Sequence, residues 1–361
     1  MNKSLLLLGL YLIVLKGLSQ PGALIPAFGT GGLVTNAGGG VFNKIGIQPS
    51  GKIIVSRPNF VGGQLIRYNA NGSLDANFGP NAQTSGGIVY VYYSPHNLII
   101  VDFIIQSDGK IIVLGKNPFS NETNIFRLNE DGSVDAGFGE SGRLIHAIVL
   151  GDEFILNSVT LDPSEKIVVT GSYEFFEADP TSLLIARFNS DGTPDLAFNG
   201  GGMVIDNIDF ELHEGGNHVG LICQVDGSSA ITILAQAGVD YFFRRYQPDG
   251  NLDLTFGTDG QFNILHNGGF IPTISSFDVD VNGRIAYLRG RTCFILNANG
   301  TNAAIHSPPQ SVFFNEIMYQ DDGKILLSGE DFFLGNFWME RLNSNGGLDF
   351  AFGNTPKIYN L

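Results

Sequence analysis

The repeated tract N-x-[DN]-G-x-x-D has residue types that can bind calcium. In one copy Asn129, Asp131 and Asp135 follow part of the ligand order of an EF-hand loop. Such a loop also needs an acidic first ligand and a bidentate Glu at its twelfth position. Arg127 and Phe138 occupy those two places. We therefore expect a turn whose Asn and Asp side chains bond to nearby backbone amides, and no metal ligand set.

A second polar segment, ELHEGGNH, is superficially similar to a zinc motif. The HExxH motif places two histidines four residues apart on one helix face. Here His213 and His218 are five apart in a glycine-rich stretch, so we interpret the segment as a solvated loop. The sequence also lacks a G-x-S-x-G elbow, a CxxC pair and a Walker loop. We therefore expect no cofactor, no metal and no catalytic residue, although a carboxylate pair for glycoside hydrolysis depends on a spatial separation and stays open.

An arginine and an aspartate recur eight residues apart in five places. A sixth copy has Ile295 and Ala303 in these two slots, so both charges are lost together. Because an unpaired buried charge is costly, the joint loss indicates that the two side chains form a pair. We predict bidentate, architectural pairs, in which each arginine ties a strand to the turn that follows it. The pairs are Arg67–Asp75, Arg127–Asp135, Arg187–Asp195, Arg245–Asp253 and Arg341–Asp349.

These pairs lie within a phrase that recurs along nearly the whole chain. Its closing phenylalanine, replaced once by His306, returns at intervals of 50, 60, 60, 58, 50 and 46 residues. We therefore expect six tandem repeats in one domain, residues 20–361. The full copies are RYNANGSLDANFG from Arg67, RLNEDGSVDAGFG from Arg127, RFNSDGTPDLAFN from Arg187, RYQPDGNLDLTFG from Arg245 and RLNSNGGLDFAFG from Arg341.

A second phrase precedes the first in every repeat, in forms such as IQSDGKIIV, which ends at Val113. Asx–Gly between apolar β-branched runs is typical of a tight hairpin turn. The runs that follow are continuous, which favours strands covered on both faces. Each repeat then has four short strands, and such units in tandem predict an all-β fold, a β-propeller of six blades. Seven blades are the alternative, and a solenoid fits less well because its repeats are usually shorter.

The ends of the repeats allow two further expectations. One strand follows Phe–Gly near Leu33 and another lies near Ile358, and one of the two must complete the last blade. The interval from His306 to Tyr319 is short, so we expect blade five to lack its outer strand.

Taken together, the two phrases resemble the delta-60 repeat family. The patterns DGKIIV and RxNxDGSxDxxFG carry the resemblance, which covers about residues 22–361. Repeat five departs from it at Ile295, Ala303 and His306, and repeat four has Ser228 in place of the lysine. The resemblance implies a β-propeller fold and an exported setting, and it implies no catalytic residue.

The amino-terminal segment has the three-part pattern of a secretory signal peptide. Lys3 precedes an apolar run from Leu5 to Leu15, and Gly17 and Ser19 suit cleavage just after Ser19. The run is shorter than the ~20 residues that span a bilayer, and no second long apolar run follows. We therefore expect residues 1–19 to be removed and the protein to be secreted, with no integral membrane segment.

Charge and cysteine content narrow the function classes. With 20 Lys plus Arg against 35 Asp plus Glu, the net charge is −15, which disfavours nucleic acid and anionic membranes as partners. Cys223 and Cys293 occupy positions that other repeats fill with apolar residues, so we expect buried thiols rather than a disulfide.

The loops at one end of the predicted blades hold most of the aromatic residues that the strands do not explain. These loops differ in every repeat, and variable loops on a rigid scaffold are where binding usually resides. Aromatic rings beside acids suit sugar rings or a basic peptide, whereas rings folded inward would cap the blade cores. We centre the predicted site on the loop Tyr173–Asp179. The candidate ligand-binding residues are Phe60, Phe119, Tyr173, Phe175, Phe176, Tyr241, Phe332 and Phe333.

We therefore expect a secreted, monomeric, non-catalytic propeller that binds a glycan or another protein. An enzyme, a hydrolase or lyase with a site at the mouth of the central channel, is one alternative, and a structural surface protein is another, since propellers host all three. An enzyme should gather polar residues unique to single repeats near one axis, whereas here such residues are scattered along the sequence.

Overall fold

The computed structural model describes residues 24–34, 42–59, 62–79, 86–93, 96–117, 119, 123–144, 153–174, 182–207, 219–237, 240–264, 273–352 and 357–359. Regular structure in these ranges is entirely β, and no helix there is long and apolar enough to cross a membrane. Six sheets have four strands each, every one built from four strands that are consecutive in the sequence, and a two-stranded hairpin is separate.

The six sheets, in chain order, comprise the following strands: β1 (Lys44–Ile47), β2 (Ile53–Asn59), β3 (Gly62–Tyr68) and β4 (Ile88–Tyr90); β7 (Ile99–Ile105), β8 (Ile111–Lys116), β9 (Thr123–Leu128) and β10 (Arg143–Leu144); β11 (Glu153–Leu161), β12 (Ile167–Glu174), β13 (Ser182–Phe188) and β14 (Met203–Asp206); β15 (Val219–Val225), β16 (Ile231–Ala237), β17 (Asp240–Tyr246) and β18 (Gln261–Ile264); β19 (Ile274–Val279), β20 (Ile285–Arg289), β21 (Thr292–Leu296) and β22 (Asn302–His306); β23 (Val312–Tyr319), β24 (Ile325–Asp331), β25 (Asn336–Leu342) and β26 (Lys357–Tyr359). The hairpin is β5 (Tyr92–Tyr93) with β6 (His96–Asn97).

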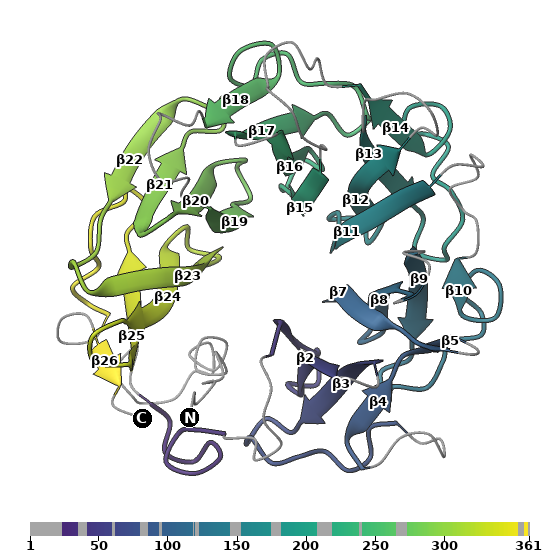
Figure 1. Cartoon of the computed structure of the whole chain (residues 1–361), viewed down its shortest axis with the longest axis horizontal. Coiled ribbons are helices and arrows are strands. Elements are labelled where there is room, and N and C mark those ends of the chain that lie inside the picture. Colours follow the sequence, from purple (N-terminus) through teal and green to yellow (C-terminus); the bar gives the residue numbers. More distant parts are fainter. Residues whose placement is uncertain are drawn as a thin grey trace. The chain divides into compact units, whose positions relative to one another are not determined.

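The fold class is the all-β propeller with six four-stranded blades, as the tandem repeats predict (Figure 1). The chain divides into two compact units. The first is mainly residues 26–223 with 233–238, and it contains blades one to three. The second is mainly residues 239–361 with 224–232, and it contains blades five and six.

The DGK phrase forms the turn between the first two strands of a blade. In blade two the Gln106 amide donates to the Lys110 carbonyl at 2.8 Å and the Gly109 amide donates to the Gln106 carbonyl at 2.9 Å. Gly109 has a φ of 86°, a conformation that glycine adopts without a steric penalty. The apolar run after the turn then forms β8, whose first five residues are buried, so the continuous pattern does mark a strand covered on both faces.

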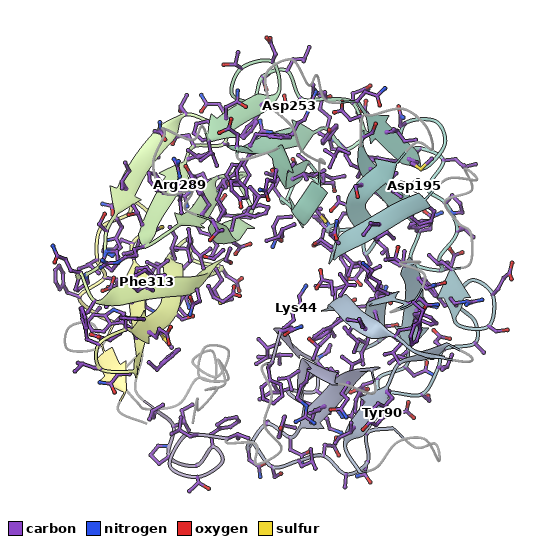
Figure 2. The ribbon with its side chains drawn as sticks, viewed as in Figure 1. Lys44, Tyr90, Asp195, Asp253, Arg289 and Phe313 are labelled. Carbon is purple, nitrogen blue, oxygen red and sulfur yellow. The ribbon has the colours of Figure 1, made fainter. Side chains whose placement is uncertain are left out.

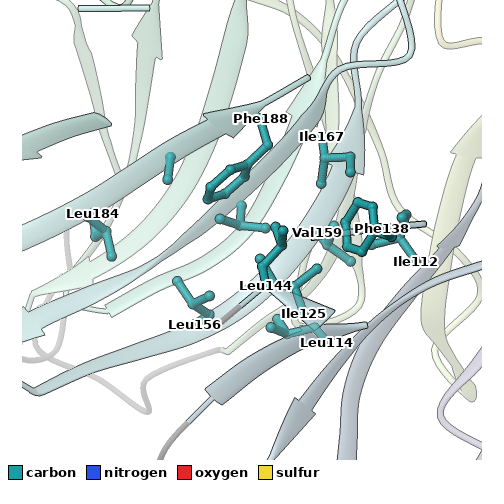
Figure 3. Packing of buried hydrophobic residues seen from close by; sticks show 12 residues of the cluster. Ile112, Leu114, Ile125, Phe138, Leu144, Leu156, Val159, Ile167, Leu184 and Phe188 are labelled. Atoms are coloured by element: carbon teal, nitrogen blue, oxygen red, sulfur yellow. The ribbon is translucent and has the colours of Figure 1, made fainter. Parts of the chain in front are cut away.

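Adjacent blades bury large apolar clusters between them. Between blades two and three of the first unit, Phe138 is fully buried and packs with residues from strands β8, β9, β11, β12 and β13 (Figure 3). The labelled side chains in that view are Ile112, Leu114, Ile125, Phe138, Leu144, Leu156, Val159, Ile167, Leu184 and Phe188. The repeated phenylalanine is therefore a core residue that joins two blades.

The two expectations about blade ends have different outcomes. Strand β26, which contains Ile358, pairs with β25 and completes blade six, whereas Leu33 makes isolated bridges. The expected loss of the outer strand of blade five is wrong, because β22 pairs with β21. Repeat five lacks the Asp–x–x–Phe–Gly segment that follows the turn in the other repeats. Its outer strand therefore begins directly after the turn, within the residues that align with the phrase.

A glycine on the second strand of blade three allows close approach of a bulge. Gly171 lies opposite Leu156, where the register of β11 shifts, and a Cβ atom at Gly171 would lie 1.9 Å from the Ile155 carbonyl oxygen. We expect Gly171→Ala to lower the free energy of unfolding by about 2 kcal/mol, because backbone must move to admit the methyl group. Gly201, which a Cβ would leave with nothing within 4 Å, is the matched control, and Gly201→Ala should change stability by less than about 0.5 kcal/mol. If urea titrations gave both variants the same loss of unfolding free energy, the close approach at Gly171 would not be the cause of the destabilisation.

Candidate binding site

The recurring arginines and aspartates are in contact in all five complete repeats. Nε of Arg67, Arg127, Arg187, Arg245 and Arg341 donates to Oδ2 of Asp75, Asp135, Asp195, Asp253 and Asp349 at 2.8, 2.7, 2.7, 2.7 and 2.9 Å, respectively. Each guanidinium also lies over the phenylalanine of its own repeat, with Arg67 4.5 Å from the Phe78 ring centroid. Each Arg–Asp pair, with the phenylalanine of its repeat, therefore forms a buried structural unit rather than an open site.

The geometry differs from a two-oxygen bidentate pair. The Asp75 Oδ2 atom receives Arg67, while Oδ1 accepts the amide of Asn77 at 3.1 Å and so caps the following turn. The guanidinium therefore bonds to one carboxylate oxygen and the turn amide to the other. Burial alone would raise the pKa of Asp75, but hydrogen bonds from Lys52 and the Asn77 amide, with the Arg67 charge, hold that pKa below its usual range.

The lysine of the DGK phrase completes this unit, and the sequence analysis did not assign it. Nζ of Lys52, Lys110, Lys166 and Lys324 lies 2.9, 3.2, 2.8 and 3.2 Å from Oδ2 of Asp75, Asp135, Asp195 and Asp349, respectively. The signal was present in the repeats, since Lys, Arg and Asp recur together in repeats one, two, three and six. In repeat four the structure corrects the sequence alignment: the Asp226 amide donates to the Ala230 carbonyl at 3.1 Å, so Ala230 and not Ser228 occupies the lysine position. The Arg245–Asp253 pair persists without a lysine.

The arginines also connect neighbouring blades inside each unit. Nη1 of Arg67 donates to the carbonyl of Glu130, and Nη1 of Arg127 donates to that of Ser190. In the second unit Arg245 donates in the same way to Ala298. Each accepting carbonyl belongs to the Asx turn of the next blade, so the pairs fix both a turn and a blade junction.

The calcium-like tract forms Asx turns. Oδ1 of Asp131 accepts the amide of Ser133 at 2.9 Å and its hydroxyl at 2.6 Å, and Asn129 Nδ2 donates to the same hydroxyl at 2.9 Å. Among the described residues, no three His, Cys, Asp or Glu side chains gather as a metal site would require. The segment 211–218 lies outside the described residues.

Both cysteines are free and buried, as their positions in the repeats predict. Burial raises the pKa of the Cys223 thiol to about 11 and that of Cys293 to about 12. Neither thiol is therefore a thiolate nucleophile near neutral pH.

The eight candidate aromatic residues have different placements. Phe119, Phe332 and Phe333 are exposed, at 78%, 69% and 80% of their surface, respectively. Tyr241 lies in β17 and is 7% exposed, so its side chain packs inside the blade. The backbone of Tyr173 lies in β12, while Phe60, Phe175 and Phe176 lie outside the described residues.

Two of the exposed rings belong to one apolar surface on blade six. Phe332, Phe333 and Leu334 form the β24–β25 turn, and Phe313 projects from β23 (Figure 2). The ring centroids of Phe313 and Phe332 are 6.1 Å apart, and those of Phe332 and Phe333 are 5.9 Å apart, both with tilted T-shaped geometry. We call these four side chains the aromatic turn surface. The sequence analysis missed Phe313 and Leu334, because strand alternation alone does not show which side chains stay uncovered.

Asp278, on the first strand of blade five, is an acid with a raised pKa. Burial raises the pKa of its carboxyl to about 6, against the lowering effect of amides from Tyr319 at 2.6 Å and Val279 at 2.9 Å. A carboxyl with a raised pKa favours the protonated form in the folded state, so its contribution to stability is present below the unfolded pKa and is lost as pH rises through about 6.

We therefore expect a pH-dependent effect of Asp278→Asn on stability. Relative to wild type, the free energy of unfolding of the variant should rise by about 2–3 kcal/mol from pH ~4 to pH ~8, whatever its offset at low pH. Urea titrations of both proteins across this range measure the difference. A difference that stays constant with pH would contradict the shift.

A model of a β-propeller family described as a domain of unknown function, DUF5122, matches residues 48–78, 106–138 and 163–198. Each match runs from the DGK turn to the phenylalanine that closes the Arg–Asp phrase. The chain is built of propeller repeats. No curated protein matches the sequence.

Among solved structures, these propeller repeats are similar to proteins of several kinds. A catalytically inactive virginiamycin B lyase from Staphylococcus aureus with quinupristin has a TM-score of 0.52 at 12% identity, covering 88% of this chain and 85% of that one. The selenomethionine-substituted lyase gives 0.50 at 13%, covering 89% and 84%. The WD40 domain of Neurospora crassa Pan2 gives 0.47 at 9%, covering 85% and 87%. At these identities the likeness shows the fold alone, and the fold does not choose a function.

Proposed function

We propose that the chain is an exported, monomeric β-propeller of the delta-60 repeat type that binds a glycan or a protein ligand without catalysing a reaction. The observation that carries this is the aromatic turn surface. Phe332 and Phe333 are 69% and 80% exposed although they are large apolar rings. Clustered exposed apolar side chains mark interaction sites more often than scattered ones do. The signal-peptide pattern of residues 1–19 supports export.

The position of the surface supports the proposal further. It lies on the β24–β25 turn, at the end of blade six opposite the repeated Asx turns. The repeated turns are accounted for by hydrogen bonds and blade junctions, whereas the loops at this end differ in every repeat. A rigid scaffold with variable loops at one end is a usual arrangement for binding.

An enzyme is the second candidate, and one observation favours it. The raised pKa of Asp278 is the kind of perturbation found at catalytic acids. The carboxyl is, however, occupied by two backbone amides, which gives it a structural role in joining β19 to β23. The binding proposal therefore rests on a site with free surface, whereas the enzymatic one does not.

Binding screens of the mature protein, residues 20–361, test the proposal. Wild type and Phe332→Ala/Phe333→Ala would be screened on a glycan array and against a random-peptide display library. We expect any ligand of the wild type to bind the variant at least about tenfold more weakly, because truncating central aromatic anchors removes much of the binding energy. The melting temperature should hardly change, since both rings are exposed. Phe350→Ala, at a ring 79% exposed outside the surface, is the matched control and should bind normally. Ligands that bind the double variant unchanged would place the site elsewhere.

A further inference from the structure

We propose that the occupant of the aromatic turn surface is a protein segment with an apolar anchor residue beside a Lys or Arg, and not a glycan. This rests on the proposed binding function and specifies its partner. Three properties of the surface favour such a partner: its engaged polar atoms, its rigidity and its neighbouring charge.

The backbone donors of the turn are all used within the protein. The Phe332 amide donates to the Ser311 carbonyl at 2.8 Å, and the Gly335 amide donates to the Asp331 carbonyl at 2.7 Å. The amides of Phe333 and Leu334 donate to Asp331 Oδ1 at 3.0 and 3.1 Å.

Two of the neighbouring polar side chains, Asp331 and Arg291, are engaged as well. Asp331 Oδ2 accepts the Ser311 hydroxyl at 2.7 Å. Arg291 lies over the Phe313 ring at 5.0 Å, and its Nε donates to the Val312 carbonyl at 2.9 Å. A sugar needs directional hydrogen bonds as well as a ring to stack on, and this turn offers side chains of Phe and Leu, which have no donors or acceptors. The surface therefore suits apolar protein side chains, which bind through contact area and shape.

The same bonds make the turn rigid before any partner arrives. Asp331 is 4% exposed, and its carboxylate fixes the turn by accepting hydrogen bonds from the two amides and the Ser311 hydroxyl. Gly335 closes the turn with a φ of 64°. A surface that is already ordered loses little conformational entropy on binding, which is how a small apolar surface can bind a partner with useful affinity.

Charge beside the surface selects the partner's flanking residue. Glu330 is exposed, and its Cα pairs with that of Phe313 across β23 and β24, so both side chains lie on one face of the sheet. The whole chain carries a net charge of −15. Arg291, over the Phe313 ring, is already bonded to the Val312 carbonyl, so Glu330 is the charge with which a partner can pair. A partner with a Lys or Arg next to its apolar anchor is therefore favoured, and the net negative charge disfavours an anionic membrane.

The test selects random 12-residue peptides by display on wild type, Phe332→Ser/Phe333→Ser, Glu330→Lys and the control Phe350→Ser. We expect wild type and Phe350→Ser to enrich the same sequences, with an aromatic or long aliphatic residue beside Lys or Arg. Synthetic copies should bind the double variant at least about tenfold more weakly. They should bind Glu330→Lys about three- to tenfold more weakly, with the loss shrinking at high salt.

Other outcomes overturn the inference in distinguishable ways. Glycan-array binding that the double variant loses would leave the proposed function standing and refute a protein partner. Turn-dependent binding to phosphatidylcholine vesicles would make the partner a membrane, and a turn-dependent dimer in size-exclusion chromatography would make it a second copy of this chain. Enriched peptides without basic residues would refute the role of Glu330. Peptides and glycans whose binding ignores the double variant would refute both the inference and the proposed site.

Discussion

Replacing Asp75 with alanine is expected to lower the free energy of unfolding by about 3–5 kcal/mol, the usual effect of removing one partner of a buried ion pair. Asp75 is 3% exposed and Arg67 is 2% exposed. Lys52 can turn toward water, because its side chain is 32% exposed in the pair. Arg67 cannot, since its guanidinium is held over the Phe78 ring and bonded to the Glu130 carbonyl. The variant therefore leaves a buried cation without its carboxylate.

The double variant Arg67→Ile/Asp75→Ala should be less destabilised than Asp75→Ala by at least about 1 kcal/mol, because it leaves no unpaired guanidinium. It reproduces the Ile295 and Ala303 of repeat five. The Glu130 carbonyl keeps a donor, because Gln48 Nε2 also bonds to it at 3.0 Å. The same order should hold for Asp135→Ala against a double replacement with Arg127.

Denaturant titrations measure both comparisons. Asp108→Asn is the matched control, since it removes a carboxylate that is 56% exposed and 3.6 Å from Lys110. Exposed pairs of this kind contribute little, so the control should change stability by less than about 1 kcal/mol. If the double variant is as unstable as Asp75→Ala, the pairing does not account for the joint loss in repeat five.

The repeat phrases predicted the fold because each local pattern agreed with the others. Asx–Gly turns fix where strands reverse, and continuous apolar runs mark strands covered on both faces. The spacing of Arg67 and Asp75 identified a contact, because a pair that disappears as a unit in repeat five leaves a trace within a single sequence. The third member, Lys52, belongs to the other phrase, and its position varies independently: repeat four keeps Arg245 and Asp253 without a lysine, so no joint loss connects the lysine to the pair.

The candidate site was less predictable, for a physical reason. Whether an aromatic ring on a loop is covered depends on the side chains that pack around it, and those come from other strands. Tyr241 and Phe332 both lie beside variable loops, yet one is 7% exposed and the other 69%. Nor could the local sequence show that the Asp331 carboxylate accepts two amides of the β24–β25 turn. These bonds leave the amides unavailable to a ligand and so make the surface more apolar.

Repeat five shows how the fold tolerates loss of the repeated unit. Its phenylalanine slot holds His306, whose Nε2 lies 2.7 Å from Oε2 of Glu340 in blade six. Oε1 of Glu340 accepts Trp338 Nε1 at 3.0 Å. The residue before the repeated arginine is apolar in repeats one to three, as Ile66 illustrates, so an acid there is as unusual as a histidine in the phenylalanine slot. A polar contact thus replaces the Arg–Phe stack at this junction.

We expect this replacement to act as a pair. Restoring the repeat residue alone, by His306→Phe, should destabilise the protein by about 3 kcal/mol, because Glu340 is 3% exposed and keeps only the Trp338 donor. His306→Phe/Glu340→Leu should be more stable than the single variant, since no buried carboxylate remains.

Glu340→Gln is the control: its amide can keep both contacts, so it should cost less than about 1 kcal/mol. Unfolding free energies of wild type, His306→Phe, Glu340→Leu and His306→Phe/Glu340→Leu close a double-mutant cycle, and additive effects would mean that the two residues changed independently. A favourable coupling would instead show that repeat five lost its Arg–Asp unit without losing its junction, because a histidine and an acid from the next blade took over the contact.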